Sequence, residues 1–167
     1  MARSSAPRKR PAANKGGQLR IIGGRWRSRK IEFPAGDGLR PTGDRIRETL
    51  FNWLQNEIVG ARCLDLFAGS GILGLEALSR GAERCTFIDN YEPACRSLTQ
   101  QLLKLEVDPA NTAVIRSDAL GWLKAGPAPK NYDLVFVDPP FSLDITAQCI
   151  ELLETSSVLA DDALIYL

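Results

Sequence analysis

The sequence contains no histidine and only four cysteines in 167 residues. The absence of histidine excludes catalysis through an imidazole base, and it removes the usual partner of cysteine in zinc sites. The cysteines, at positions 63, 85, 95 and 149, also lack the paired spacing of metal ligands. We therefore expect no bound metal, and we expect small buried thiols in a reducing cytoplasm.

Long apolar runs are also missing. No run approaches the roughly 20 residues that a membrane-spanning helix needs. The N-terminus has no apolar stretch of the kind found in signal peptides. We therefore expect a cytoplasmic protein with no membrane partner. A hydrophobic content of 44% is enough for one domain with a substantial core.

Acidic residues are absent from the first 30 positions, which contain ten Arg or Lys side chains. The other 137 residues carry 11 basic and 20 acidic side chains, so the net charge of +1 hides a basic arm on an acidic body. This division favours a polyanionic partner, although a solvated tail that only improves solubility is the alternative. Residues 1–17 have almost no apolar side chains, and we expect them to be disordered.

The most informative stretch is an apolar run that begins at Cys63 and leads into three glycines. Gly69, Gly71 and Gly74 follow it in G-x-G-x-x-G spacing. Glycines at these positions allow a tight turn, the approach of a ligand to the backbone, and close packing of the next helix. Such a turn can be purely structural. Between a strand and a helix, it favours a nucleotide-type cofactor.

A second motif, Asp138-Pro139-Pro140-Phe141, ends another apolar run. Ligands of doubly wound sheets bind beyond the carboxyl ends of the strands, so both motifs point to one crevice. The pair resembles S-adenosylmethionine (SAM) methyltransferases that modify exocyclic amines of bases. The Asp138 carboxylate and Pro139 carbonyl would orient the amine, and Phe141 would stack on a flipped base. The alternative is a strand ended by a rigid Pro-Pro turn, with Phe141 as core filler.

From residue 61 the chain alternates strand and helix, which predicts an α/β fold with a doubly wound, mostly parallel sheet of the Rossmann-like class I type. We expect three parts: a disordered basic arm (1–17), a hairpin and helix extension (18–60), and a SAM-binding methyltransferase core (61–167). Strands are expected at 63–67, 84–89, 112–116, 132–137 and 163–167, with helices at about 72–80, from residue 93, after residue 118 and at about 143–154.

Three acids fall at the ends of three successive predicted strands. Asp89, 18 residues after Gly71, is where a carboxylate can accept both ribose hydroxyls. Asp118 would meet the adenine amino group, and Asp65 would lie near the methionine ammonium. Each acid alone could be a solvated loop residue, but three together favour SAM as the cofactor.

The extension is predicted to form two strands, 19–22 and 25–33, joined by a Gly23-Gly24 turn. Alternation would place its arginines on one face and Trp26 on the other, where Trp26 either packs or stacks on a base. A helix capped by Thr42 follows. Its expected core stripe is Ile46, Leu50, Trp53, Leu54 and Ile58, with Arg45 and Arg47 solvated or in contact with RNA.

Four segments, at 19–31, 40–54, 65–71 and 138–141, occur in the same order in the bacterial 16S rRNA guanine-N2 methyltransferase D family, which this chain resembles over 19–167. The resemblance implies a SAM-dependent enzyme that methylates N2 of one guanine, at position 966, of 16S rRNA in an assembling or assembled 30S subunit. It also implies that Thr42 helps to hold the SAM carboxylate. We expect the protein to be a monomer. Family members continue into a closing pair of antiparallel strands, so we expect a core that is incomplete after residue 167.

Three sets of candidate residues follow. Catalysis is expected at Asp138, Pro139, Pro140 and Phe141. The cofactor is expected at Thr42, Asp65, Phe67, Ala68, Gly69, Gly71, Asp89, Asn90, Asp118 and Ala119. RNA contacts are expected at Arg20, Arg25, Arg27, Arg29, Arg40, Arg45 and Arg47. The alternatives are an adenine-N6 or protein-glutamine methyltransferase and a non-catalytic RNA-binding module. A dehydrogenase is disfavoured because no histidine is present for hydride transfer.

Overall fold

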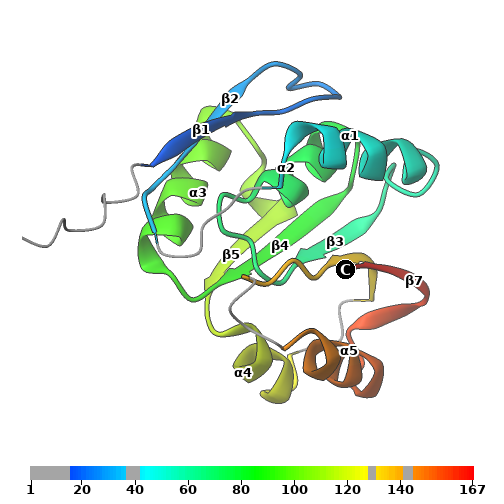
Figure 1. The fold of residues 1–167 in the computed structure, drawn as a ribbon. Helices are drawn as coiled ribbons and strands as arrows, with labels where there is room; N and C mark the ends of the chain where they lie inside the picture. Colours follow the sequence, from blue (N-terminus) through cyan, green and yellow to red (C-terminus); the bar gives the residue numbers. More distant parts are fainter. Residues whose placement is uncertain (1–15, 37–41, 128–130, 141–144) are drawn as a thin grey trace, which may run out of the picture.

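The computed structural model describes residues 16–36, 42–127, 131–140 and 145–167. In this part of the chain, a small two-stranded sheet lies beside a five-stranded sheet flanked by helices (Figure 1). The elements are β1 (Gly17–Arg20), β2 (Lys30–Phe33), α1 (Asp44–Trp53), β3 (Arg62–Asp65), α2 (Ile72–Ser79), β4 (Arg84–Asp89), α3 (Glu92–Lys104), a 3-10 turn η1 (Pro109–Asn111), β5 (Thr112–Arg116), α4 (Ala119–Lys124), β6 (Tyr132–Phe136), α5 (Thr146–Thr155) and β7 (Leu159–Tyr166).

The five-stranded sheet has the order β5-β4-β3-β6-β7, and all of its neighbouring strands are parallel. This confirms the predicted doubly wound α/β fold. The chain enters the sheet at the central strand β3, moves outward to β5, and then returns to the other side of β3 as β6. The strand order therefore reverses between β3 and β6, and open α/β sheets bind ligands at such a point.

Alternate residues of the central strands face two separate cores. Cys63, Phe87 and Phe136 pack with apolar side chains of α1, α2 and α3, whereas Leu64 and Val135 pack with those of α4 and α5. Figure 1 shows the same division of helices between the two faces of the sheet. Each fully buried side chain of this size contributes on the order of 2 kcal/mol. Burial on both faces explains why these strands are nearly continuous apolar runs in the sequence.

Helix α2 packs directly on the central strands because Gly74 has no side chain. A Cβ atom at Gly74 would lie 2.3 Å from the ring of Phe87 and 2.6 Å from Sγ of Cys85. All eight residues of α2 are buried. The last glycine of the motif therefore sets the distance between helix and sheet, the role that such a glycine has in dinucleotide-binding folds.

The N-terminal extension (16–36 and 42–60) forms the predicted antiparallel hairpin, but with a longer loop. The β1–β2 ladder ends at Arg20 opposite Lys30, and the chain between them, residues 21–29, forms the loop. Gly23 does not make the tight turn. Its N–H instead donates to the carboxylate of Glu76 in α2, at 2.7 Å. The predicted strand alternation is therefore wrong for Arg25, Arg27 and Arg29, which lie in this loop.

Helix α1 begins later than predicted. Its N-cap is Gly43, with no side-chain capping bond, so Thr42 is not the cap. The expected core stripe holds for Leu50, Leu54 and Ile58, which are buried. It is wrong for Ile46 and Trp53, which are 56% and 79% exposed. Phe51 and Arg47, both fully buried, occupy the core-facing positions instead.

The last two elements also differ from the predicted bounds. Helix α5 begins at Thr146, and β7 starts four residues earlier than expected, at Leu159. β7 pairs with β6 through a register shift between Tyr132 and Leu134. Among the described residues, no helix is long and apolar enough to cross a membrane.

Candidate active site

The centre of the site is the glycine turn (residues 66–71), which joins β3 to α2. Backbone bonds fasten it to both neighbouring strands: Leu66 N–H donates to Phe136 O at 3.1 Å, and Ala68 N–H donates to Ile88 O at 2.9 Å. Gly69 and Gly71 then adopt positive φ, at 52° and 75°, a conformation that glycine adopts without strain. The Gly71 N–H donates to Ala68 O at 2.6 Å, which closes the turn directly before α2 begins.

Asp89, the last residue of β4, lies beside this turn. Its Oδ2 accepts the Gly69 N–H at 2.7 Å, and its Oδ1 accepts the Tyr91 N–H at 2.8 Å. Both bonds fix the direction of the carboxylate. Asp89 is half-buried and the next residue, Asn90, is exposed, so a ribose placed over the turn would have access to both.

Asp65, the last residue of β3, is 2% exposed and lies beneath the turn. Its Oδ2 accepts the Gly74 N–H of α2 at 3.2 Å. Burial, together with the negative charges of Asp138 and Asp89, raises the pKa of Asp65 to about 7, against the lowering effect of the Gly74 bond. The three strand-end carboxyl groups are thus near enough to interact. Such a site favours a cationic ligand, and SAM carries a sulfonium and an ammonium group.

Asp118 occupies the end of β5 as predicted, but it also has a structural role. Its Oδ2 accepts the Gly121 N–H at 2.8 Å and so caps α4. The side chain is exposed, whereas the next residue, Ala119, is buried. The cap explains why an acid stands here without any ligand, and its contact with adenine stays a prediction. Phe67, which belongs to the glycine turn, is half-buried.

The second half of the site is the Asp138 turn (residues 138–140), which follows β6. Asp138 is exposed, and Pro139 and Pro140 are half-buried. Thr42, from the N-terminal extension, donates its hydroxyl to Asp138 Oδ2 at 2.6 Å. Tyr166 of β7 lies close by: burial raises the pKa of its hydroxyl, and the Asp138 charge raises it further. Phe141, the last residue of the motif, lies outside the described residues.

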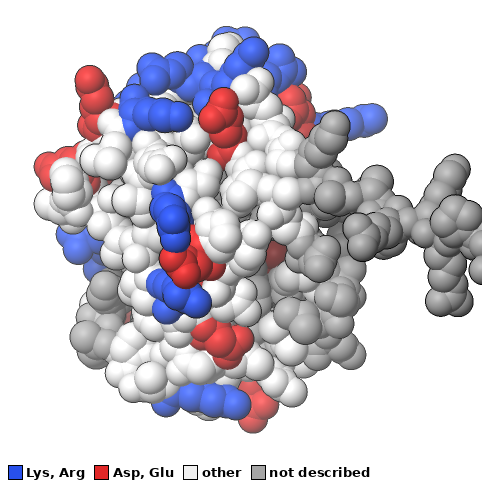
Figure 2. All heavy atoms as spheres, turned by 90° about the vertical axis from the view of Figure 1, so that its left-hand side faces the viewer, with Lys and Arg blue, Asp and Glu red and all other residues white. Residues whose placement is uncertain are grey.

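Five of the seven arginines that were predicted to contact RNA are exposed. Arg25, Arg27 and Arg29 are exposed in the hairpin loop. Figure 2 shows a group of basic side chains at the top of the molecule. The Arg25 guanidinium lies 4.1 Å from the ring centroid of Trp26, which is buried, so Trp26 packs rather than offering a free face. Arg20 and Arg45 are also exposed, whereas Arg40 lies outside the described residues.

Arg47 corrects one prediction. It is fully buried, so an RNA contact through Arg47 is excluded in this fold. Its Nη1 donates to Glu76 at 3.1 Å, and its Nη2 donates to Asp44 at 2.6 Å. Burial lowers the pKa of Arg47, against the effect of these two carboxylates. The pairing explains the error, because buried charges require paired, hydrogen-bonded partners.

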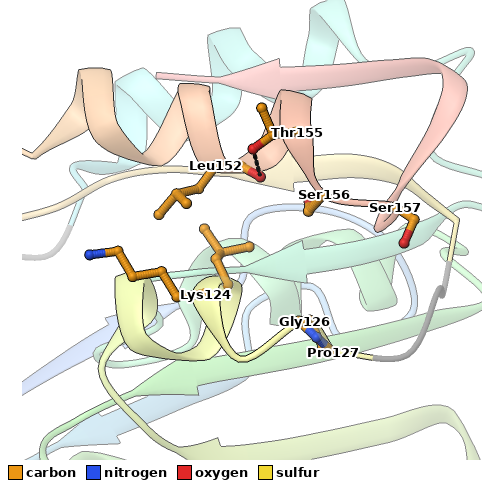
Figure 3. A pocket seen from close by; sticks show the side chains of 8 residues that line it. Lys124, Gly126, Pro127, Leu152, Thr155, Ser156 and Ser157 are labelled. Atoms are coloured by element: carbon orange, nitrogen blue, oxygen red, sulfur yellow. Dashed lines mark hydrogen bonds between the residues drawn. The ribbon is translucent and has the colours of Figure 1, made fainter.

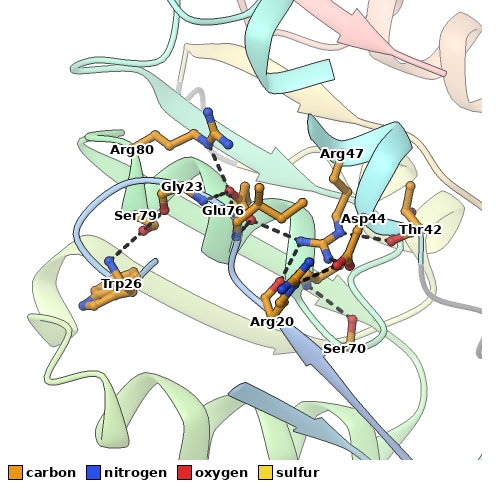
Figure 4. A network of polar contacts seen from close by, with 12 residues as sticks. Arg20, Gly23, Trp26, Thr42, Asp44, Arg47, Ser70, Glu76, Ser79 and Arg80 are labelled. Carbon is orange, nitrogen blue, oxygen red and sulfur yellow. Dashed lines mark hydrogen bonds and ion pairs between the residues drawn. The ribbon is translucent and has the colours of Figure 1, made fainter. Parts of the chain in front are cut away.

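Glu76 is the functional neighbour that sequence reasoning missed. It is fully buried, and its carboxylate also accepts the N–H groups of Ile22 and Gly23 and the Arg80 Nε, at 2.7 to 3.2 Å. Figure 4 shows these partners converging from the hairpin, α1 and α2. We call Glu76 and its bonded partners the Glu76 network. The available signal was one acid inside the otherwise apolar segment 72–78.

Two hollows in the described part of the chain lie away from this site. One, of about 490 Å³, is lined by the ends of α4 and α5, including Lys124 and Thr155 (Figure 3). The other, of about 620 Å³, lies at the opposite, amino end of β3 and β6 and includes Arg62 and Asp133. Neither contains a residue of the predicted site. No described group of acids and cysteines has the arrangement of a metal site.

Comparison with known proteins agrees with this geometry. The family described as Conserved hypothetical protein 95 matches residues 19–167. Ribosomal RNA small subunit methyltransferase D of Escherichia coli (strain K12) is 51% identical over 160 residues, which cover 95% of this chain and 78% of that protein. The Haemophilus influenzae protein of the same name is 44% identical over 153 residues, covering 92% and 79%. The solved structure of yhhF from Escherichia coli has a TM-score of 0.80 at 48% identity, covering 90% and 80% of the two chains.

Proposed function

Because the chain belongs to the family of ribosomal RNA small subunit methyltransferase D, we propose that it methylates N2 of one guanine, at position 966, in 16S rRNA. SAM is the cofactor, and methylation of rRNA is the activity that the family name gives. The choice of guanine, of its N2 atom and of position 966 goes further and rests on the motif resemblance. The protein would act in the cytoplasm as a monomer, on an assembling or assembled 30S subunit.

One observation carries the proposal: the glycine turn and the Asp138 turn follow the adjacent strands β3 and β6, between which the strand order reverses, and the charges of Asp138 and Asp89 both act on Asp65. The Asp89 carboxylate, already aimed by two backbone N–H groups, would bind the ribose hydroxyls. Asp118 and Ala119 would border the adenine. Asp65 and the backbone of the glycine turn would border the methionine end of SAM.

When bound, SAM supplies an activated methyl group on a sulfonium, whose departure as a neutral thioether needs little assistance. The residues of the chain act on the acceptor amine instead. The Asp138 carboxylate and the Pro139 carbonyl would accept hydrogen bonds from its two N–H groups, direct the nitrogen lone pair at the methyl carbon, and stabilise the positive charge that develops there. As the new N–C bond replaces the S–C bond, the nitrogen would release one proton, for which the Asp138 carboxylate is the adjacent acceptor. The Pro-Pro pair limits backbone motion of this turn.

Selection of one guanine must come from more than this crevice. Guanine N2 lies on the minor-groove side of its pair, where base pairs offer few distinguishing features. The exposed arginines of the hairpin loop suit phosphate groups, which carry no sequence information. We therefore propose that the enzyme recognises RNA shape, and surfaces formed when ribosomal proteins are bound.

The test is tritium transfer from SAM, with naked 16S rRNA, assembled 30S particles, duplex DNA and bulk protein as acceptors. We expect label in 30S particles, poor transfer to naked rRNA, and N2-methylguanosine after digestion to nucleosides. Label in N6-methyladenosine would support the adenine alternative. RNA binding without any transfer would support a non-catalytic module.

A further inference from the structure

We propose that Thr42 is a positioning residue for the reaction: its hydroxyl orients the Asp138 carboxylate, and buried Arg47 holds Thr42 in place. The inference rests on the proposed function, because it gives Asp138 the task of holding the amine. It differs from the role that the family resemblance gives Thr42, which is to bind the carboxylate of SAM.

The contact between Thr42 and Asp138 is short and joins distant parts of the chain. Thr42 Oγ1 lies 2.6 Å from Asp138 Oδ2, across 96 residues of sequence. This distance is typical of a hydroxyl that donates to an ionised carboxylate, which is a strong class of hydrogen bond. Asp138 is exposed, and an exposed side chain without such a partner samples several rotamers. Because the Thr42 hydroxyl binds Oδ2, it restricts the orientation of the carboxylate plane. The other oxygen, Oδ1, can then accept an N–H of the amine in that plane.

Thr42 is itself fastened by Arg47. The Arg47 Nε donates to the Thr42 carbonyl at 3.0 Å, while Nη1 donates to Arg20 O and to Glu76, both at 3.1 Å. The Nη2 group donates to Asp44. Four acceptors from β1, α1, α2 and the segment before α1 thus immobilise one fully buried guanidinium (Figure 4).

These bonds connect the two halves of the site through the N-terminal extension. Glu76 belongs to α2, the helix that begins directly after Gly71 of the glycine turn. From Glu76 the contacts run to Arg47, to the Thr42 carbonyl and, through the Thr42 hydroxyl, to Asp138. The Asp138 carboxylate is therefore positioned relative to α2, the same helix that begins directly after the glycine turn. An orientation error at this point matters greatly, because misplacement by 1 Å can reduce a rate about 100-fold.

The experiment compares Thr42→Val, which keeps the shape but loses the hydroxyl, with Thr42→Ser, which keeps it. Thr155→Val is the matched control, because the Thr155 hydroxyl is also a hydrogen-bond donor but lies at the far end of α5. SAM affinity is measured by calorimetry, and single-turnover methylation of 30S particles is measured at saturating SAM. We expect Thr42→Val to slow methylation by roughly 10-fold with SAM affinity unchanged. Thr42→Ser and Thr155→Val should behave as the wild type.

A double variant tests whether Thr42 acts through Asp138. In an Asp138→Ala background, Thr42→Val should cause no further loss, because residues that act as a unit are not additive. Weakened SAM binding with a normal rate at saturation would overturn the inference in favour of the SAM-carboxylate role. An equal loss in both backgrounds, or no loss at all, would also overturn it. Absence of methyl transfer by the wild-type protein would instead refute the proposed function.

Discussion

The predicted cofactor half of the site, at the ends of β3 and β4, is shaped by the backbone, whereas the predicted catalytic half, at the end of β6, is held by side chains from the N-terminal extension. Positive φ at Gly69 and Gly71 and two ladder-like bonds define the first half. A threonine hydroxyl and a buried Arg–Glu pair define the second. One fold can therefore locate a cofactor by its topology and still depend on an added segment to locate the reacting group.

The largest effect should be on stability, and it should follow from removing the negative charge of Glu76, the buried partner of Arg47. Glu76→Gln leaves the Arg47 guanidinium buried beside a neutral amide, so we expect a loss of roughly 3 to 5 kcal/mol in the free energy of unfolding. Urea denaturation measures it. Glu83→Gln is the control, because Glu83 forms an exposed pair with Arg84 and should change stability by less than about 1 kcal/mol. Similar losses in both variants would show that burial of the Arg47–Glu76 pair does not matter.

The two halves should separate in function when one carboxylate from each is removed. Asp138→Ala should reduce the single-turnover rate by about 100-fold or more while SAM affinity is kept, because its main contact forms with the base in place. Asp89→Ala should chiefly weaken SAM, because its oxygens border the glycine turn. Calorimetry with SAM and single-turnover rates distinguish the two variants. The opposite pattern would mean that the two roles are exchanged.

A smaller effect should appear in the pH dependence of stability. The folded-state pKa of Asp65, about 7, lies above its ordinary value of 3.8, so the folded state binds a proton that the unfolded state releases. The resulting stabilisation is complete below about pH 4 and is lost as pH rises through 7. Between about pH 5.5 and 7.5, wild type should lose about 2 kcal/mol relative to Asp65→Asn. Parallel stability curves for the two proteins would contradict the raised pKa.

The smallest effect concerns the outer surface, which neither half of the site needs. Replacing Arg25, Arg27 and Arg29 with Gln should weaken RNA binding and reduce the slope of log affinity against log salt by roughly 0.7 to 0.9 for each phosphate that is no longer neutralised. SAM binding should persist, because these residues lie on the hairpin. Arg84→Gln and Arg96→Gln, two exposed arginines in side-chain ion pairs away from the hairpin loop, serve as controls of the same chemistry. An unchanged slope would mean that the hairpin only solubilises the protein.

The difference between the halves also explains how far sequence reasoning could go. The succession of strands and helices and the glycine turn follow from local patterns, because apolar runs and glycine spacing report backbone geometry directly. Arg47 and Glu76 could not be predicted in the same way, because each charge is buried only by virtue of the other, 29 residues away. The prediction is wrong at Ile46 and Trp53 for the same reason: a helical stripe assumes that apolar residues face the core, and here an arginine does.

The sequence separation between hydrogen-bonded residues also determines the order in which these bonds can form while the chain is synthesised. The hairpin leaves the ribosome early, but its bonds to Glu76 and Ser79 span 53 to 56 residues. At about 5 to 20 residues per second, the hairpin waits several seconds for α2 to be made. The Thr42–Asp138 bond spans 96 residues and can form only later still. The Asp138 carboxylate therefore cannot be oriented before residue 138 has been made, and the glycine turn cannot be bonded to β6 before Phe136 has been made.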